Sequence, residues 1–349
     1  MQTTEVIIIG AGPIGIELAA ALKLLGVDYV HLEAGQIGQT ITWYPRQARF
    51  FSSPDRIAIA GVPLHTVDQS KASREEYLAY LRGVVDQFDL EIRTFERVDS
   101  IERGDDSFIV RTTCGHESGT CAAKSIVFAI GDMHRPRLLH IPGEGLPHVS
   151  HYFDEPHIYF RKRLLIVGGR NSAVEAAIRC QRAGAQVALS YRRGEFDGKS
   201  VKYWLLPEIE VLIKTGEIRF HADTTPTRIT TEAVTLKPMP GDAATFDVEA
   251  DFVLLLVGYE MDTTLLEKVG VELHGENRAP CLDHDTMQTN VAGLYVAGTA
   301  AAGTQTRFRL FIENCHPHVS KITRALTGRD APFATGDKTH SDRYSLPES

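Results

Sequence analysis

A glycine-rich turn near the start of the chain has the residue types and spacing of a nucleotide-binding loop. Residues 6–15 read VIIIGAGPIG, in which Gly10, Gly12 and Gly15 follow the spacing G-x-G-x-x-G. The first glycine of such a turn permits a tight bend, the second lets the backbone approach a pyrophosphate, and the third lets a helix pack closely on the strand. Because the free N–H groups and dipole of a helix N-terminus attract phosphate, the turn predicts a dinucleotide site.

The elements around this turn support the same interpretation. The apolar run at 6–9 predicts a strand buried on both faces, as in a parallel sheet, and residues 16–25 have helical periodicity. A second strand, expected at 29–32, ends at Glu33, whose carboxylate can bind a ribose hydroxyl. Strand, turn, helix, strand and terminal acid together predict a Rossmann-type domain.

A second segment repeats this order of elements. It begins at residue 164 with LLIVGGRNSAVEAAIRCQRAGAQVALSYRR. Gly168 and Gly169 open the turn, Arg170 takes the place of the middle glycine, and Ala173 replaces the last. This match to the glycine pattern is looser, but strand, turn, helix and strand still follow one another.

The strand expected at 186–190 in this second segment ends in basic residues. It is followed by Tyr191, Arg192 and Arg193 instead of an acid. An acid at this position would bind the 2′-hydroxyl of NAD, whereas arginines suit the 2′-phosphate of NADP. The sequence therefore favours NADPH over NADH at the second site.

Two later segments can complete the first domain. SIVFAIG at 125–131, followed by Asp132, and TNVAGLYVAGT at 289–299 both predict strands that end at a glycine, and a helix is expected at 311–326. We therefore expect an α/β protein with two Rossmann-type, three-layer ββα domains. The first covers 1–157 and 284–349, the second covers 158–283 and is inserted into it, and 328–349 form a polar tail.

Bulk composition limits the partners. The chain has 349 residues, 37 basic and 45 acidic, for a formal net charge of −8. Such a charge gives no general attraction to nucleic acid or to an anionic membrane. No apolar run approaches the roughly 18 residues of a membrane span, and MQTTEVIIIG lacks the basic start of a signal peptide. We expect a cytoplasmic protein.

The five cysteines give no disulfide framework. Their number is odd, their spacing is wide, and no CxxC pair occurs, which also argues against an internal redox dithiol. Cys114 and Cys121 flank a polar turn and suggest a surface thiol pair on a hairpin. His116 lies between them, but the spacing fits no standard metal pattern.

Longer stretches resemble one group of flavoproteins over nearly all of residues 4–326. They are GAGPIG at 10–15, WYPRQARFFSSPDRIAIAGVPL at 43–64, HYFDEPHIYF at 151–160, GGRNSAVEAA at 168–177, WLLPEIEVL at 204–212 and FIEN at 311–314. In these the chain resembles the thioredoxin-reductase-like flavoproteins and, within them, the YpdA-type bacillithiol disulfide reductases.

This resemblance implies a thioredoxin reductase-like fold, FAD in the first site, NADPH in the second, and a homodimer or homotetramer. It also implies a rotating NADPH domain, with hinges expected at 156–163 and 283–290. The expected FAD contacts are Gly10, Gly12, Pro13, Ile14, Gly15, Glu33, Phe51, Ser52, Ala129, Gly131, Gly298 and Thr299. The expected NADPH contacts are Gly168, Gly169, Asn171, Ser172, Ala173, Tyr191, Arg192, Arg193 and Gly258.

Two positions depart from the pattern. The YpdA-type group carries a cysteine after the proline of the first glycine motif, but here the residue is Ile14, which can form no thiolate. Related flavoproteins end the last strand in Gly-Asp, whereas this chain has Gly298 and Thr299. Cys315, at the expected start of the last helix, is a candidate redox thiol because a helix N-terminus lowers a thiol pKa, and His316 is a candidate for proton transfer.

The predicted activity is hydride transfer from NADPH to FAD and then to a small-molecule or redox-protein acceptor. A low-molecular-weight disulfide is the first candidate. A ferredoxin or flavodoxin, as in NADP reductases without CxxC, and oxygen, as in flavin monooxygenases, stay open. A non-catalytic nucleotide-binding redox sensor is the alternative of another class, although no output module is recognisable in the sequence.

Overall fold

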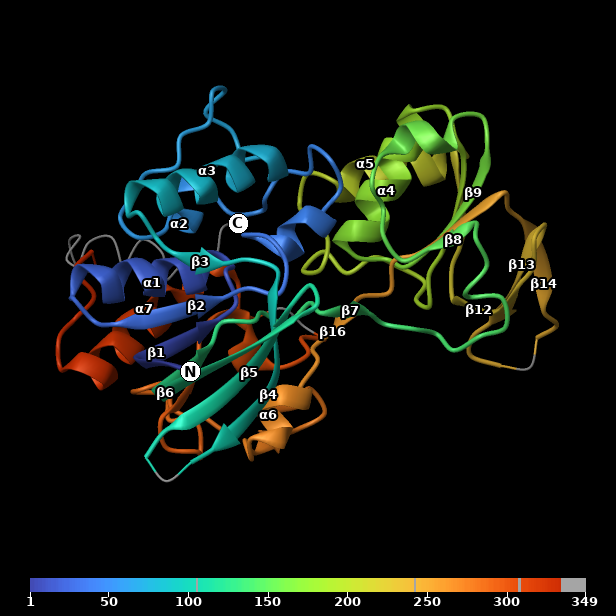
Figure 1. Cartoon of the computed structure of the whole chain (residues 1–349). Coiled ribbons are helices and arrows are strands. Elements are labelled where there is room, and N and C mark those ends of the chain that lie inside the picture. Colours follow the sequence, from blue (N-terminus) through green and yellow to red (C-terminus); the bar gives the residue numbers. More distant parts are fainter. Residues whose placement is uncertain (105, 242, 307–308, 334–349) are drawn as a thin grey trace. The chain divides into compact units, whose positions relative to one another are not determined.

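The computed structural model describes residues 1–104, 106–241, 243–306 and 309–333. The chain divides into two compact units (Figure 1). The first unit contains residues 1–42, 47–135 and the described chain from 259 onward, and the second contains 43–46 and 136–258. The second unit therefore interrupts the first.

The first unit is built on one large sheet. Its strands are β1 (Gln2–Ile9), β2 (Tyr29–Leu32), β3 (Ile92–Arg93), β4 (Glu96–Arg103), β5 (Phe108–Cys114), β6 (Glu117–Phe128) and β19 (Leu294–Val296). The order is β3-β2-β1-β6-β5-β4, and β19 also pairs with β6. The first half of β6 pairs with β5 in antiparallel register, and its last three residues pair with β19 in parallel. A parallel sheet and an antiparallel three-stranded ribbon thus share β6.

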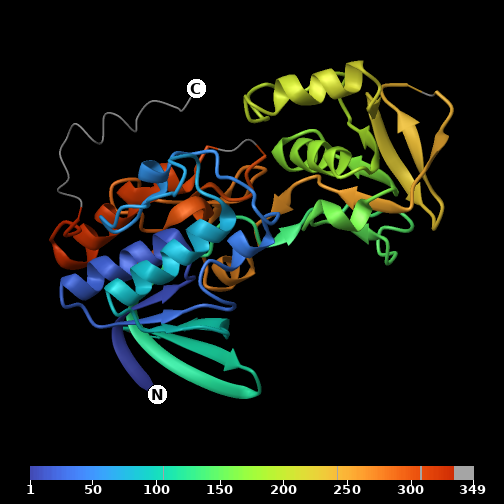
Figure 2. The ribbon, with the colours of Figure 1, turned by 90° about the horizontal axis from the view of Figure 1, so that it is seen from above.

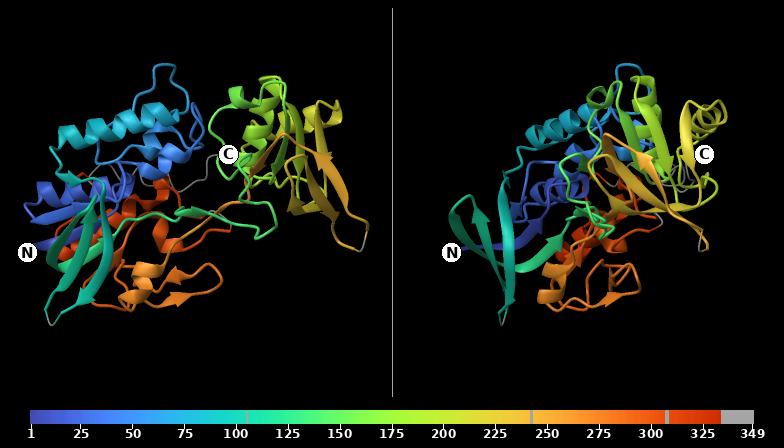
Figure 3. Two further views of the ribbon diagram at one scale, coloured as in Figure 1. Left: turned by 45° about the vertical axis from the view of Figure 1, so that its right-hand side comes forward. Right: turned by 90° about the vertical axis from the view of Figure 1, so that its right-hand side faces the viewer.

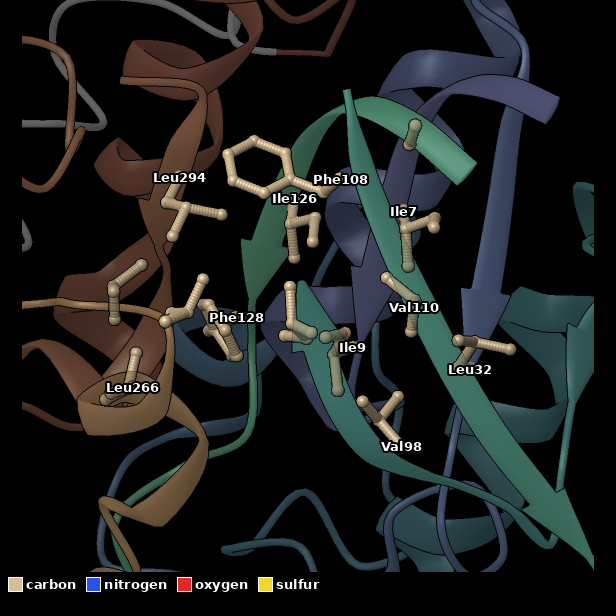
Figure 4. Close-up of a cluster of buried hydrophobic side chains, with 14 of the residues drawn as sticks. Ile7, Ile9, Leu32, Val98, Phe108, Val110, Ile126, Phe128, Leu266 and Leu294 are labelled. Carbon is tan, nitrogen blue, oxygen red and sulfur yellow. The ribbon is translucent and has the colours of Figure 1, made fainter. Parts of the chain in front are cut away.

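The core of this unit lies between the parallel strands and the ribbon. Figure 4 shows Ile7, Ile9 and Phe128 of the parallel strands facing Val98 and Val110 of the ribbon. The short helix α6 (Thr264–Lys268) closes this side of the core with Leu266 (Figure 4). Burial on both faces explains why the second half of β1, residues 6–9, is a continuous apolar run instead of an alternating one.

Helices cover the other face of the parallel strands (Figure 2). They are α1 (Pro13–Leu24), α3 (Arg74–Gln87) and α7 (Ile312–Thr327). Shorter elements of this unit are α2 (Pro54–Ile57), the 3-10 turns η1 (Gln39–Trp43) and η3 (Gly298–Ala302), and the hairpin β17 (Leu273–His274) and β18 (Ala279–Pro280). Among the helices of the described residues, none is long and apolar enough to cross a membrane.

The second unit repeats the architecture. Its parallel sheet has the order β11-β10-β9-β15-β8, from the strands β8 (Val149–Ser150), β9 (Arg163–Val167), β10 (Gln186–Ser190), β11 (Ile218–His221) and β15 (Phe252–Leu255). One face packs against α4 (Asn171–Arg182), α5 (Leu206–Lys214) and the 3-10 turn η2 (Pro156–Tyr159). The other face packs against an antiparallel ribbon (Figure 3) of β12 (Thr224–Ile229), β13 (Ala233–Pro238) and β14 (Phe246–Glu249).

The chain crosses between the units at 135–136 and 258–259, not at the predicted boundaries 157/158 and 283/284. The crossings are the paired strands β7 (Arg135–Pro136) and β16 (Tyr259–Glu260). The predicted boundaries differ because β8 already belongs to the second sheet, whereas α6 and the residues after it pack on the first core. For the same reason the predicted hinges are wrong: 156–163 lie within the second unit and 283–290 within the first.

An ion pair joins α1 to α7 inside the first unit. His316 Nδ1 lies 2.7 Å from a carboxylate oxygen of Glu17, and Nε2 lies 3.0 Å from the carbonyl oxygen of Arg56. Because both ring nitrogens face acceptors, the doubly protonated imidazolium is the favoured form. Burial lowers the pKa of His316, but the charge and hydrogen bond of Glu17, the Arg56 carbonyl and the charge of Glu313 outweigh it, so the net pKa is raised.

Replacing His316→Leu should destabilise the protein by about 3 kcal/mol, because Glu17 then stays buried without its partner. The folded-state pKa of His316 lies above its unfolded value. Its contribution is therefore complete below about pH 6.5 and is lost as the pH rises through the folded-state pKa. Urea unfolding of the wild type and the variant, at about pH 6 and about pH 9, measures this difference.

The Glu17→Gln/His316→Leu double variant should lose less unfolding free energy than the two single variants lose together, because it buries no unpaired charge. His116→Leu, on the exposed hairpin turn, serves as the control histidine. A stability difference that does not depend on pH would contradict the ion pair.

Candidate functional site

Three of the predicted segments converge at the carboxyl edge of the first sheet. Residues 10–15, 129–132 and 298–299 follow β1, β6 and β19, which are neighbours in parallel register. A Cβ added at Gly298 would lie 3.5 Å from the Cβ of Ile14, and one added at Gly131 would lie 3.8 Å from the hydroxyl oxygen of Thr299. Ligand sites in open α/β sheets lie at this edge.

The turn between β1 and α1 leaves space for a ligand only at its middle glycine. A Cβ at Gly10, where φ is +104°, would lie 2.5 Å from the carbonyl oxygen of Ala129, and one at Gly15 would lie 2.0 Å from the carbonyl oxygen of Gly10. At Gly12, the N-cap of α1, a Cβ would meet nothing within 4 Å. No side chain caps this helix end, and Pro13 begins it. The open backbone and uncapped N-terminus fit a pyrophosphate.

Two residues of β2 and its exit hold the turn. Glu33 accepts hydrogen bonds from the backbone N–H groups of Ala11, at 2.6 Å, and Gly35, at 2.8 Å, so its carboxylate lies beside the turn. His31 is fully buried, and its Nε2 lies 2.9 Å from the carbonyl oxygen of Gly10. Burial, opposed by that hydrogen bond, lowers the pKa of His31 to about 4. The neutral ring therefore donates a hydrogen bond from Nε2 to the carbonyl oxygen of Gly10.

Asp132 is a site residue that the sequence analysis did not select. It is buried, and it accepts hydrogen bonds from Gln305 Nε2, at 3.0 Å, and from the hydroxyl of Thr299. Burial raises the pKa of Asp132, and these hydrogen bonds oppose the shift. Asp132 and Thr299 thus meet just beyond the ends of the neighbouring strands β6 and β19. The position of Asp132 directly after Gly131 was the available signal.

The start of α7 brings Cys315 and His316 to the interior of the unit. Cys315 is fully buried, and burial, with the charges of Asp132 and Glu17, raises its pKa. The predicted lowering of this thiol pKa is therefore wrong, because desolvation outweighs the helix N-terminus. His316 is held by its two acceptors, which leaves neither nitrogen free for proton transfer.

Other residues near this helix have structural partners. His318 Nδ1 accepts a hydrogen bond from the N–H of Gly298 at 3.2 Å, and burial lowers the pKa of His318 to about 4. Ser52 is buried and Phe51 is half-buried. Both directly precede the stretch that leads into α2, which packs on α7.

The predicted residues of the second unit also gather at one edge. A Cβ at Gly168, where φ is +143°, would lie 2.5 Å from the carbonyl oxygen of Leu256, and one at Gly169 would lie 2.4 Å from the ring of Tyr191. At Gly258 a Cβ would meet nothing within 4 Å. Ala173 is buried against Gly168. Glycine is therefore a steric requirement at 168 and 169, whereas at Gly258 the positive φ of +105° favours glycine.

Basic side chains surround the N-terminus of α4. Arg170 is its N-cap residue, and Asn171 and Ser172 form its first turn. The pKa of Arg170 is lowered by burial and by the charges of Arg192 and Arg193, which places three positive charges together. Asn171 is already engaged, because its Oδ1 accepts a hydrogen bond from the N–H of Lys202 at 2.6 Å.

The cysteines do not form the predicted surface thiol pair. Cys114 is exposed, but Cys121 is buried and lies opposite Val110 in the pairing of β5 with β6. All five cysteines are free thiols within the described residues.

Comparison with known proteins agrees with this geometry. The pattern of the pyridine nucleotide-disulphide oxidoreductase family matches residues 7–298. Bacilliredoxin reductase Bdr of Bacillus subtilis (strain 168) is 35% identical over 331 residues, covering 95% of this chain and 99% of the relative. The structure of bacillithiol disulfide reductase Bdr (YpdA) from Bacillus cereus is 35% identical, has a TM-score of 0.89, and covers 94% of this chain and 100% of that one.

A thioredoxin reductase from T. acidophilum shares the fold at 20% identity, with a TM-score of 0.71 over 93% of this chain and 98% of that one. The predicted thioredoxin reductase-like α/β fold and the resemblance to the YpdA-type group are thereby confirmed. The chain belongs to the pyridine nucleotide-disulphide oxidoreductase family, as a flavoprotein enzyme that uses FAD and a pyridine nucleotide.

Proposed function

We propose that this enzyme passes a hydride from NADPH to FAD and then reduces a low-molecular-weight disulfide. The observation that carries the choice of NADPH is the cluster of Arg170, Arg192 and Arg193 in the second unit. The name of the similar Bacillus cereus protein, bacillithiol disulfide reductase, supports the choice of a disulfide. The balanced reaction is NADPH, a proton and RSSR giving NADP⁺ and two RSH.

FAD, when bound, supplies a group that accepts a hydride and passes on two electrons. The chain's own residues bind and orient it. The N-terminus of α1 with the open backbone at Gly12 binds the pyrophosphate, and Glu33 binds the ribose hydroxyls of the adenosine. Gly131, Asp132 and Thr299 line the edge where the three segments converge.

The second unit binds the nicotinamide nucleotide by its phosphates. The start of α4 is uncapped by any side chain and carries no acid in its first turn, so its N–H groups suit the pyrophosphate. Arg192 and Arg193 follow β10, at the position that meets the 2′-substituent of the ribose. Among the described residues no carboxylate forms an ion pair with Arg170, Arg192 or Arg193, although the charge of Asp197 acts on Arg170 and Arg193. The net positive charge of this cluster would suit the 2′-phosphate.

The acceptor half-reaction proceeds without the cysteine of the YpdA-type group. Ile14 is buried against Gly298 and offers no sulfur. Cys315 is buried, with its pKa raised. A protein thiolate is therefore not part of the proposed step, and FAD, when bound, would itself supply the two electrons that the disulfide takes up.

Anaerobic mixing with NADPH should bleach the visible flavin spectrum much faster than mixing with NADH. The Arg192→Ala/Arg193→Ala variant should weaken NADPH binding by roughly 100-fold, since each charge-assisted hydrogen bond contributes about 1.5 kcal/mol or more. The affinity for NADH should change far less. Arg103→Ala, on the antiparallel ribbon of the first unit, is the matched control. Equal losses for the two nucleotides would contradict the phosphate assignment.

Asp132→Asn should raise the reduction potential of the bound flavin by a few tens of millivolts, since about 30 mV corresponds to 1.4 kcal/mol for a two-electron couple. The reason is that a nearby negative charge disfavours electron uptake. The FAD content should persist, because asparagine keeps the contacts to Thr299 and Gln305. Asp99→Asn, on β4, is the control, and a potential that does not change would place Asp132 away from the flavin.

The acceptor is tested with enzyme that NADPH has reduced under anaerobic conditions. Bacillithiol disulfide should reoxidise the flavin and yield two thiols per flavin, at a rate that Cys315→Ala leaves within about threefold, a change below 1 kcal/mol. The two other acceptor classes serve as comparisons. Faster reoxidation by ferredoxin or by air would overturn the disulfide assignment but not the NADPH–FAD reaction.

A further inference from the structure

Three potential metal ligands of different chemistry meet on the small hairpin of the first unit. The carboxylate of Glu272, a ring nitrogen of His274 and the sulfur of Cys281 all lie within 4.8 Å of one another. Glu272 directly precedes β17, His274 lies in β17, and Cys281 directly follows β18, which packs on η3. Nothing in the proposed electron transfer requires these residues.

The hairpin itself explains why the three side chains converge. Leu273 pairs with Pro280 and His274 with Ala279, and the N–H of Cys281 donates to the carbonyl oxygen of Glu272 at 2.8 Å. Cys281 therefore lies opposite Glu272, and opposite residues of an antiparallel pair share a face. Glu272 and His274 also share a face, because alternate residues of a strand point the same way. Glu272, His274 and Cys281 therefore point to the same side of the hairpin, where all three can contact one ion.

The backbone under this site is held in place on both sides. The N–H of Glu272 donates to Asn290 Oδ1 at 2.9 Å, and Asn290 Nδ2 donates to the carbonyl oxygen of Gly270 at 2.9 Å. At the tip of the hairpin, Asn277 Nδ2 donates to the carbonyl oxygen of Ala302 at 2.6 Å, and the Asn277 carbonyl accepts from the N–H of Thr304 at 2.7 Å. The ligands are therefore presented by a fixed backbone, which lowers the ordering cost of binding.

The side chains are available and their chemistry is selective. Glu272 and His274 are exposed and Cys281 is half-buried, and within the described chain their ligand atoms form no hydrogen bond or ion pair. One thiolate, one imidazole and one carboxylate suit zinc, whereas magnesium and calcium prefer oxygen ligands alone. The thiolate and the carboxylate together neutralise a divalent ion.

We propose that Glu272, His274 and Cys281 bind a divalent ion of the zinc class. Three protein ligands leave a fourth tetrahedral position open for water or an external ligand. Binding displaces the proton of the Cys281 thiol, so the affinity falls as the pH is lowered. This site does not depend on the flavin or on the identity of the electron acceptor.

The test uses the full-length holoprotein, reduced and freed of metal by dialysis against a chelator. Calorimetric titration with Zn²⁺ should give one ion per chain. X-ray absorption should show one sulfur at about 2.3 Å and nitrogen or oxygen ligands at about 2.0–2.2 Å. Cys281→Ser and His274→Ala should each weaken Zn²⁺ binding at least tenfold. An unchanged flavin spectrum would show that the variants are folded.

The matched control is the other exposed cysteine–histidine pair, on the hairpin between β5 and β6. Cys114→Ser and His116→Ala should leave Zn²⁺ affinity and stoichiometry unchanged. The proposal is overturned by the absence of stoichiometric binding, by binding that persists in Cys281→Ser, or by a spectrum without sulfur. Loss of binding in the Cys114→Ser protein would overturn it as well, since it would place the ion on the other hairpin.

Discussion

The carboxyl end of β1 has no room for side chains, and the position of α1 follows from that. A side chain at Gly15 would overlap the carbonyl oxygen of Gly10, and one at Gly10 would overlap that of Ala129. Helix and strands can therefore approach to backbone contact only because both residues are glycine. This approach fixes the direction of α1, so that its uncapped end lies beside Gly12 and its buried face presents Glu17 to α7.

Several ionisable groups around this turn are held in one protonation state by burial and by their partners. His31 and His318 are neutral and serve as hydrogen-bonding groups for the backbone at Gly10 and Gly298. The pKa of His316 is raised because Glu17 faces it. Rigid groups of this kind orient a cofactor without exchanging protons with it.

Local signals in the sequence predicted the elements that bind nucleotides. The strands at 29–32 and 186–190 occur with the predicted bounds, and the last helix begins and ends one residue later than predicted. These elements depend on short-range apolar patterns and on glycine, which a sequence displays directly. The insertion of one domain into the other followed from the order of these segments along the chain, because the strand at 289–299 comes after the second glycine turn.

The errors concern properties that depend on the whole fold. The boundary near 157 failed because β8 is only two residues long and joins its sheet across a large separation in sequence. The prediction of a lowered Cys315 pKa failed because burial of the thiol depends on packing by several segments. Glu17 was missed as a partner of His316 because 299 positions separate them. Asp132 was not selected because its importance arises from contacts with Thr299 and Gln305, which are distant in the sequence.

The insertion of the second unit also determines the order in which the chain can fold during synthesis. The parallel sheet of the first unit needs β19, and the face that carries the glycine turn needs α7. Both are translated after the second unit, whose own sheet is already complete at β15. Domains fold as units while the ribosome extends the chain. The inserted unit can therefore fold first, whereas the parallel end of β6 keeps an unpaired edge until β19 has been made.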